Sequence, residues 1–296
     1  MNPIRSLVPL PALLLLASML IAGCGGGSDQ GAAPSGGPHP KRIISLSPSA
    51  TEMLYAIGAG PQVKAVDELS NHPKNAPRTK LSGFKPNAEA IIDENPDLVV
   101  LSDDMNGIVK SLTKVKIPVV QTPAATKLAD SYAEITRLGK ATGHSAQAAK
   151  VVAGMKKGIA AAVAKVKKPA TPLTYYHELD PSFHSATSKT FIGQVYGLFG
   201  LKNIADKAKE QAGGYPKLSA EYVAEADPDL VFLADTKCCG QTAAKLGERP
   251  GWAKLTAVRN DGVVPLDDDI ASRWGPRIVD LAQQVGAAVT KAEQAQ

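Results

Sequence analysis

Three histidines are among the residues whose side chains could bind a metal ion. His72, His177 and His184 each lie near a loop in which a ligand is expected. Neutral imidazole is a frequent zinc ligand, and three such rings would suffice for a site. Their spacing has neither helical regularity nor the Cys-x-x-Cys pattern of structural zinc sites. The sequence therefore predicts no dedicated metal site.

The sequence lacks the motifs of common hydrolases and nucleotide-binding enzymes. It contains no Gly-x-Ser-x-Gly elbow, no phosphate-binding loop and no His-Glu-x-x-His, and His177-Glu178 has no second histidine at helical spacing. The acidic runs at 103–104 and 267–269 are typical of solvated loops at strand ends. We expect a protein that is not an enzyme.

One phrase occurs twice. NAEAIIDENPDLVVLSD at 87–103 returns as SAEYVAEADPDLVFLAD at 219–235, so that Glu89 matches Glu221. Each copy reads as a short helix, a Pro-Asp break and a buried strand. The duplication predicts one α/β lobe per copy, and a ligand is expected between the lobes.

The segments around the two copies alternate between strands and helices. Such alternation is typical of parallel sheets, whose ligands bind beyond the carboxyl ends of the strands. Ser49 or Thr51 is expected to cap the first helix. We predict two Rossmann-like lobes with parallel sheets, joined by a single long backbone helix. Strands are expected at 42–47, 63–66, 98–101, 117–120, 173–176, 231–235 and 263–266, and helices at 49–58, 145–167, 190–201 and 276–291.

The N-terminus resembles a bacterial lipoprotein signal. Arg5 precedes the apolar run 7–19, and Ile21-Ala22-Gly23 is followed by Cys24. The resemblance implies cleavage before Cys24, acylation of this cysteine and anchoring on the extracytoplasmic face of the membrane. The predicted domains are a signal peptide at 1–23, a flexible linker at 24–40, an N-terminal lobe at 41–145, the linking helix at 146–168 and a C-terminal lobe at 169–296.

Length and composition agree with two lobes. The chain has 296 residues, of which 44% are hydrophobic, and this is enough for two cores of ordinary size. The net charge of +5 comes from scattered lysines without a dense basic block. We therefore expect no nucleic-acid partner.

Several runs together resemble a family of transport proteins. These are RIISLSPSATEMLYAIGAG, the two copies of the phrase, the linking helix and the closing RWGPRIVDLAQQV. They look like the helical-backbone substrate-binding proteins of ABC importers, and within that family they are most similar to cobalamin binders. The resemblance implies a monomer that delivers a corrinoid to a permease dimer with ATPase subunits, without a cofactor of its own. Ferric-siderophore or haem binding is the alternative cargo, and a surface sensor is a further alternative.

The resemblance also assigns roles to residues. It implies that Glu89 and Glu221 dock to the permease, although each could also act locally at its helix start. Ligand contacts are implied for the first loop and for aromatic, polar and charged side chains of later loops. A histidine could replace an axial ligand of the cargo's metal, and each loop residue could instead serve local packing. The implied ligand-binding residues are Ser47, Pro48, Ser49, Ala50, Thr51, His72, Phe84, His184, Asp269, Arg273 and Trp274.

Cys238 and Cys239 are adjacent and directly follow an expected strand. If Cys24 is lipidated outside the cytoplasm, these two are left to bond to each other or to another molecule. A disulfide between neighbouring cysteines is the favoured prediction, and two free thiols are the alternative.

Overall fold

The computed structural model describes residues 39–167 and 169–294. The predicted signal peptide at 1–23, the lipidation site Cys24 and the predicted linker up to residue 38 lie outside the described residues. Within the part of the chain that is described, no helix is long and apolar enough to cross a membrane.

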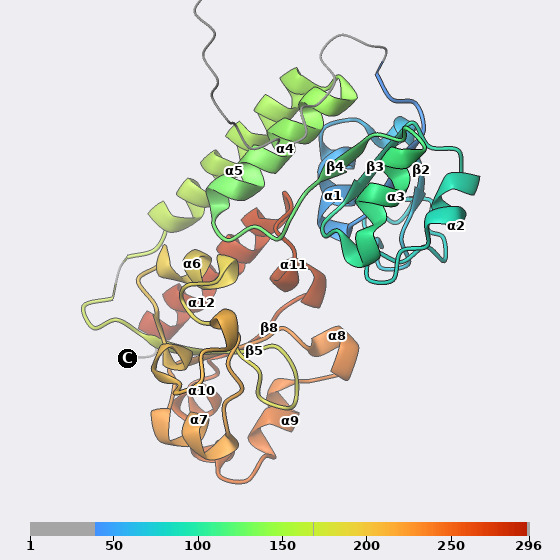
Figure 1. The fold of residues 1–296 in the computed structure, drawn as a ribbon. Coiled ribbons are helices and arrows are strands. Elements are labelled where there is room, and N and C mark those ends of the chain that lie inside the picture. Colours follow the sequence, from blue (N-terminus) through green and yellow to red (C-terminus); the bar gives the residue numbers. More distant parts are fainter. Residues whose placement is uncertain (1–38, 168, 295–296) are drawn as a thin grey trace, which may run out of the picture. The chain divides into compact units, whose positions relative to one another are not determined.

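The first sheet consists of four parallel strands in the order β2-β1-β3-β4 (Figure 1). Strands β1 and β3 are buried along their whole length, as is usual where helices cover both faces of a parallel sheet. The carboxyl ends of the strands therefore lie at one edge. The elements are β1 (Ile43–Leu46), α1 (Pro48–Ala56), β2 (Val63–Val66), α2 (Ala88–Asp93), β3 (Leu98–Leu101), α3 (Ile108–Lys114), β4 (Val119–Gln121) and α4 (Leu128–Thr142).

The second sheet repeats the first, with strand order β6-β5-β7-β8. All of its pairings are parallel too. The predicted class, two parallel-sheet α/β lobes, is confirmed. Its elements are β5 (Thr174–Glu178), α6 (Phe191–Gly197), β6 (Lys202–Asn203), α7 (Ala220–Ala226), β7 (Leu230–Leu233), α8 (Thr236–Cys239), α9 (Ala243–Gly247), α10 (Thr256–Arg259), β8 (Val263–Pro265), α11 (Asp268–Ser272) and α12 (Ile278–Gln294).

The repeated phrase forms equivalent parts of both sheets. Its strands are β3 and β7, each third in its sheet and next to the lobe's first strand. The repeated aspartate ties these neighbours together. Asp97 accepts hydrogen bonds from the backbone N–H groups of Lys41 and Arg42, at 2.7 and 2.8 Å, just before β1. Asp229 accepts from the N–H and hydroxyl of Thr174 at the start of β5, at 2.7 and 2.8 Å. The Pro-Asp pair is therefore retained for the fold.

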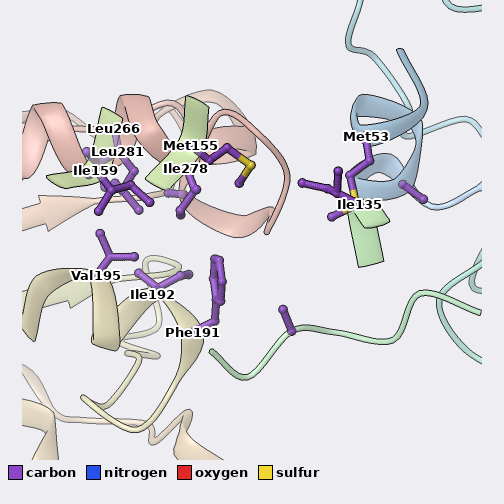
Figure 2. Packing of buried hydrophobic residues seen from close by; sticks show 14 of the residues in the cluster. Met53, Ile135, Met155, Ile159, Phe191, Ile192, Val195, Leu266, Ile278 and Leu281 are labelled. Atoms are coloured by element: carbon purple, nitrogen blue, oxygen red, sulfur yellow. The ribbon is translucent and has the colours of Figure 1, made fainter. Parts of the chain in front are cut away.

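Helix α5 (Ser145–Ala164) lies between the two sheets in the chain and packs against α4 and α12 (Figure 1). It ends at Ala164, earlier than the predicted 168. Figure 2 shows Met155 and Ile159 beside Ile278 and Leu281, all four of them nearly out of water. Burying an aliphatic side chain of this size contributes about 1.5–3 kcal/mol, so this seam holds α5 firmly on α12.

Helix α4 was not predicted. It packs along α5 and is joined to it by only Gly143 and His144. Gly143 ends the helix with φ at 81°, in the left-handed region that glycine favours. Apolar residues recur at helical spacing from Leu128 through Tyr132, Ile135 and Leu138, so the sequence did carry a helical signal here. Ile135 is fully buried next to Met53 of α1 (Figure 2).

Candidate ligand-binding site

The first candidate loop, residues 47–51, is used to hold neighbouring segments together. Ser47, and not Ser49 or Thr51, caps α1 by accepting the N–H of Ala50 at 3.3 Å. Its hydroxyl also accepts a 2.8 Å hydrogen bond from Ser102, in the loop after β3. The expected cap at Ser49 or Thr51 is therefore wrong, because the helix starts two residues earlier at Pro48.

The hydroxyl of Thr51 is equally occupied. It lies 2.8 Å from the Ser45 hydroxyl and 2.9 Å from that of Ser70, and the Thr51 side chain is fully buried. Ser49 and Ala50 are buried as well, which leaves only Pro48 partly accessible in this loop. Both hydroxyls therefore bond within the protein, and ligand contacts from Ser47 and Thr51 remain a prediction.

Arg273 lies in a network that reaches from the second half of the chain to the first. One guanidinium nitrogen donates to Glu52 at 2.9 Å and to the Asn71 side chain at 2.8 Å. The other donates to the backbone carbonyl of Leu69 at 3.1 Å and to Asp269 at 2.6 Å. With four acceptors already in place, Arg273 positions loops and has little capacity left for a ligand.

Glu52 is the centre of this network. It is only 3% exposed and also accepts from Nε and Nη2 of Arg277, at 2.9 and 2.5 Å. Asp269 joins the same cluster through Asn71, whose side-chain amide donates to it at 3.0 Å. Burial alone would raise the pKa of Asp269, but hydrogen bonds and charges from Lys237 and Arg273 hold it below its usual value.

Trp274 is anchored on α4. Its indole N–H donates to Glu134 at 2.8 Å, and its carbonyl accepts from the Ser131 hydroxyl at 2.5 Å. Glu134 is buried on α4, and this burial raises its pKa to about 7 despite the hydrogen bond from Trp274. The ring packs against the main apolar cluster. The indole N–H of Trp274 therefore bonds within the protein.

The three candidate histidines, His72, His177 and His184, do not form a metal-binding cluster. His72 is exposed, in the loop after β2, while His184 is half exposed and lies 2.8 Å from Asp180. His177 was expected near a loop, but β5 extends as far as Glu178 and buries it completely. Burial lowers the pKa of His177 to about 4. Among the described residues, no group of three or more metal-binding side chains is placed to hold an ion.

Phe84 is the most exposed large apolar side chain among the described residues, at 65%. The preceding residue, Gly83, lies against the end of β1. A Cβ at position 83 would lie only 2.3 Å from the carbonyl oxygen of Leu46, so this close approach requires glycine. Tyr215, which is 46% exposed, was missed. It follows Gly214, with φ at 104°, and both Gly-aromatic pairs come shortly before a copy of the repeated phrase. Phe84 lies three residues before its copy and Tyr215 four residues before its own, so only an alignment with a one-residue gap could have found Tyr215.

Leu69 and Met105 are exposed on the loops that follow β2 and β3. Phe84 and Tyr215 are likewise exposed in segments that precede a helix. A large ligand with apolar faces would cover these side chains.

A second buried polar group, also missed, lies at the carboxyl ends of β5 and β7. Glu178 is fully buried and receives both terminal nitrogens of Arg249, at 2.5 and 2.6 Å. Burial and the neighbouring Glu178 raise the pKa of Asp235 to about 7. Glu178 and Arg249 thus form a buried ion pair at these strand ends.

Glu89 and Glu221 are exposed on α2 and α7. In the described part of the chain neither forms a salt bridge. The caps of these helices are Asn87 and Ser219, each accepting an N–H at 3.1 Å. Backbone and Ser219 hydrogen bonds lower the pKa of Glu221, so it has a local interaction as well.

Two parallel-sheet lobes with exposed apolar loops define a solute-binding protein. The family described as periplasmic binding protein matches residues 43–270, and the chain belongs to that family. It is the substrate-binding component of an ABC transporter, a class that captures solutes outside the cytoplasm and works with a membrane permease and an ATPase.

Two relatives illustrate the family. The chain is 26% identical over 307 residues to the uncharacterized ABC transporter substrate-binding lipoprotein YvrC of Bacillus subtilis, covering 94% of this chain and 95% of that one. It is 30% identical over 251 residues to the cobalamin-binding protein of Halobacterium salinarum, covering 82% of this chain and 67% of the relative.

Solved structures of three similar proteins share the fold, each at 25% identity. The possible iron-binding protein of Staphylococcus epidermidis has a TM-score of 0.73, with 85% of this chain and 99% of that one covered. The vitamin B12 binding protein BtuF of Vibrio cholerae has a TM-score of 0.70, with 86% and 98% covered. The heme binding protein HutB of the same organism has 0.72, with 83% and 97% covered.

Proposed function

We propose that this protein captures cobalamin and presents it to the permease of its ABC importer. The observation that carries the proposal is the pair of exposed aromatic side chains, Phe84 and Tyr215, one before each copy of the repeat. Aromatic rings pack well on a flat corrin surface, because they offer a large apolar area with little conformational freedom to lose. The cobalamin-binding relative at 30% identity supports the same cargo.

Arg273 supports a cargo of low charge. The other large cofactor-like cargoes, ferric siderophores and haem, carry carboxylates or other anionic groups that favour free arginines. Here Arg273 is already bonded to Glu52, Asn71, Asp269 and the Leu69 carbonyl. Calorimetric titration with cyanocobalamin, haemin and a ferric siderophore tests this choice, and saturable heat with cyanocobalamin is expected.

Haem is the second candidate. The similarity to the heme binding protein HutB supports it, as do the exposed side chains of His72 and Tyr215. A histidine nitrogen or a tyrosine oxygen can bind haem iron directly. A Soret band that shifts in His72→Ala or Tyr215→Phe would favour haem over cobalamin.

Permease docking is proposed for Glu89 and Glu221. The two carboxylates occupy equivalent exposed positions on α2 and α7, and the fold does not need them as caps. Matched charges of one sign, one in each lobe, would orient the protein on a permease dimer and speed association.

Lipid attachment is proposed for Cys24, which follows a short apolar run and small residues. The name of the lipoprotein relative supports it. Two or more acyl chains hold a protein stably at a membrane, since each buried methylene contributes about 0.8 kcal/mol. Labelled palmitate should enter the full chain and not the Cys24→Ala variant.

A further inference from the structure

A disulfide joins Cys238 to Cys239 in the second half of α8, directly after the carboxyl end of β7. Figure 1 shows α8 as a short separate turn. Both cysteines are exposed, and α8 buries none of its four residues. A helical turn this short has no stability of its own, so the disulfide and a few polar contacts must hold it.

Those polar contacts come from residues 267–269, which are the N-cap and the first two residues of α11. The carboxylate of Asp268 accepts the backbone N–H groups of Lys237 and Cys238, at 3.0 and 2.8 Å, and the Thr236 hydroxyl at 2.9 Å. The ammonium group of Lys237 lies 2.6 Å from Asp267 and 3.0 Å from Asp269. Asp267, Asp268 and Asp269 therefore all bond to residues of α8.

Asp269 connects this turn to the first half of the chain. It accepts from Arg273 at 2.6 Å and from the Asn71 side chain at 3.0 Å. Arg273 in turn bonds to Glu52 and to the carbonyl of Leu69, next to exposed apolar side chains of the candidate site. The backbone around the disulfide is thus linked through the start of α11 to the loop that carries Leu69 and Asn71.

The other end of the turn touches the buried ion pair. Beyond Gly240, the backbone N–H of Gln241 donates to the carbonyl of Asp235 at 3.3 Å. The Gln241 side chain accepts from Arg249 at 2.9 Å, and Arg249 is the partner of Glu178. The turn that contains the disulfide therefore bonds to Asp268 on one side and, through Gln241, to Arg249 on the other.

We propose that Cys238–Cys239 is a site of thiol–disulfide exchange with an extracytoplasmic dithiol, and that the reduced form binds cargo more weakly. The second half of this statement rests on the proposed function. Exposure of both sulfurs gives a reductant access. Reduction opens the covalent ring of residues 238 and 239, so that noncovalent contacts, among them those to Asp268 and Asp269, must hold the turn. We expect the reduced turn to support Asp269 and Arg273 less firmly.

The exchange balances without further reagents. A thiolate of the dithiol attacks one sulfur, the Sγ–Sγ bond breaks, and the other sulfur leaves as a thiolate that takes a proton from water. The second thiol of the reductant then attacks the mixed disulfide and releases the remaining cysteine. Two thiols form in this protein, and one disulfide forms in the reductant.

The chemical half is tested on the full chain by alkylation before and after treatment with dithiothreitol. Trypsin cleaves after Lys237 and Lys245, so the peptide 238–245 carries both cysteines of interest and excludes Cys24. We expect no alkylation of this peptide before reduction and two alkylations afterwards. Two alkylated cysteines in the unreduced protein would overturn the proposal. Faster hydrogen exchange at residues 237–238 after reduction is the matching readout of the released turn.

The binding half is tested by titrating cyanocobalamin into oxidised and reduced protein. Reduction should weaken affinity about tenfold, which corresponds to about 1.4 kcal/mol. The double variant Cys238→Ser with Cys239→Ser should bind like the reduced form and should not respond to dithiothreitol. Equal affinity of the oxidised and reduced forms would overturn this half. If neither form binds cyanocobalamin, the cargo proposal fails, while the alkylation experiment still decides on exchange.

Discussion

Glu52 and Arg273 lie 221 positions apart in the chain, yet Nη1 of the arginine donates a 2.9 Å hydrogen bond to Oε1 of the glutamate. The glutamate side chain is 2% exposed and the arginine side chain 10%. A charge pair this deep costs free energy to desolvate, and it persists only because Arg277 and Asn71 complete its hydrogen bonds. We infer that the ion pair positions Arg273 against the loop that carries Leu69 and Asn71.

We expect Arg273→Ala to lower the free energy of unfolding by about 3 kcal/mol, because it leaves the buried Glu52 carboxylate with one partner fewer. Urea denaturation would measure the change. Arg259→Ala is the matched control, since Arg259 is exposed on α10 and should cost little. Equal losses in the two variants would contradict a positioning role for Arg273.

Phe84→Ala and Tyr215→Ala should each weaken cyanocobalamin binding about tenfold, because each removes an aromatic surface that the corrin would cover. Stability should change little, since both side chains are largely exposed. Val115→Ala is the control, as this apolar side chain is 51% exposed at the end of α3, away from the strand ends. Unchanged affinity in both aromatic variants would argue against the site.

Glu89→Gln combined with Glu221→Gln should leave cyanocobalamin binding intact and reduce uptake through the permease at least several-fold. The physical reason is the loss of two charges that would orient docking. Asp93→Asn combined with Glu225→Gln removes exposed charges from the same two helices and serves as the control. If both double variants transport equally well, docking does not use the repeated glutamates.

Glu134 predicts a pH effect on stability. Burial raises its pKa from 4.5 to about 7, so the folded protein holds this proton more tightly than the unfolded chain does. The free energy of unfolding therefore falls as the pH rises from about 4.5 to about 7, and the loss is complete above that range.

Glu134→Gln should remove this loss while keeping an acceptor for Trp274. At pH 8 the variant should be more stable by up to about 3 kcal/mol, and near pH 4 the two proteins should be alike. Other titrating groups, such as His177, are common to both, so their difference isolates Glu134. Parallel curves from denaturation at several pH values would refute the assignment.

Most of the fold could be predicted from the repeat, because its helix, Pro-Asp break and buried strand occur in both halves. Strand β2 was placed at its observed residues, whereas α4 was missed although its apolar residues recur at helical spacing from Leu128 to Leu138. The extension of β5 over His177 and Glu178 was missed for a related reason. These polar residues look like loop, but inside the protein Nδ1 of His177 lies 2.8 Å from the Tyr196 hydroxyl and Glu178 pairs with Arg249.

The candidate site was less predictable. Sequence position predicted candidate loops, but it could not tell which hydroxyls and charges bond within the protein. Thr51 and Arg273 have the chemistry of ligand contacts, yet their partners, Ser45, Ser70 and Glu52, are brought together only by tertiary structure. Tyr215 could have been found by extending the repeat upstream with a one-residue gap to the Gly-aromatic pair.

The most direct test of the central claim is calorimetric titration of the full chain with cyanocobalamin and, in parallel, with haemin. The proposed function predicts saturable heat with cyanocobalamin at a one-to-one ratio, and affinity that falls in Phe84→Ala and Tyr215→Ala. Absence of heat with cyanocobalamin, together with saturable binding of haemin, would contradict it.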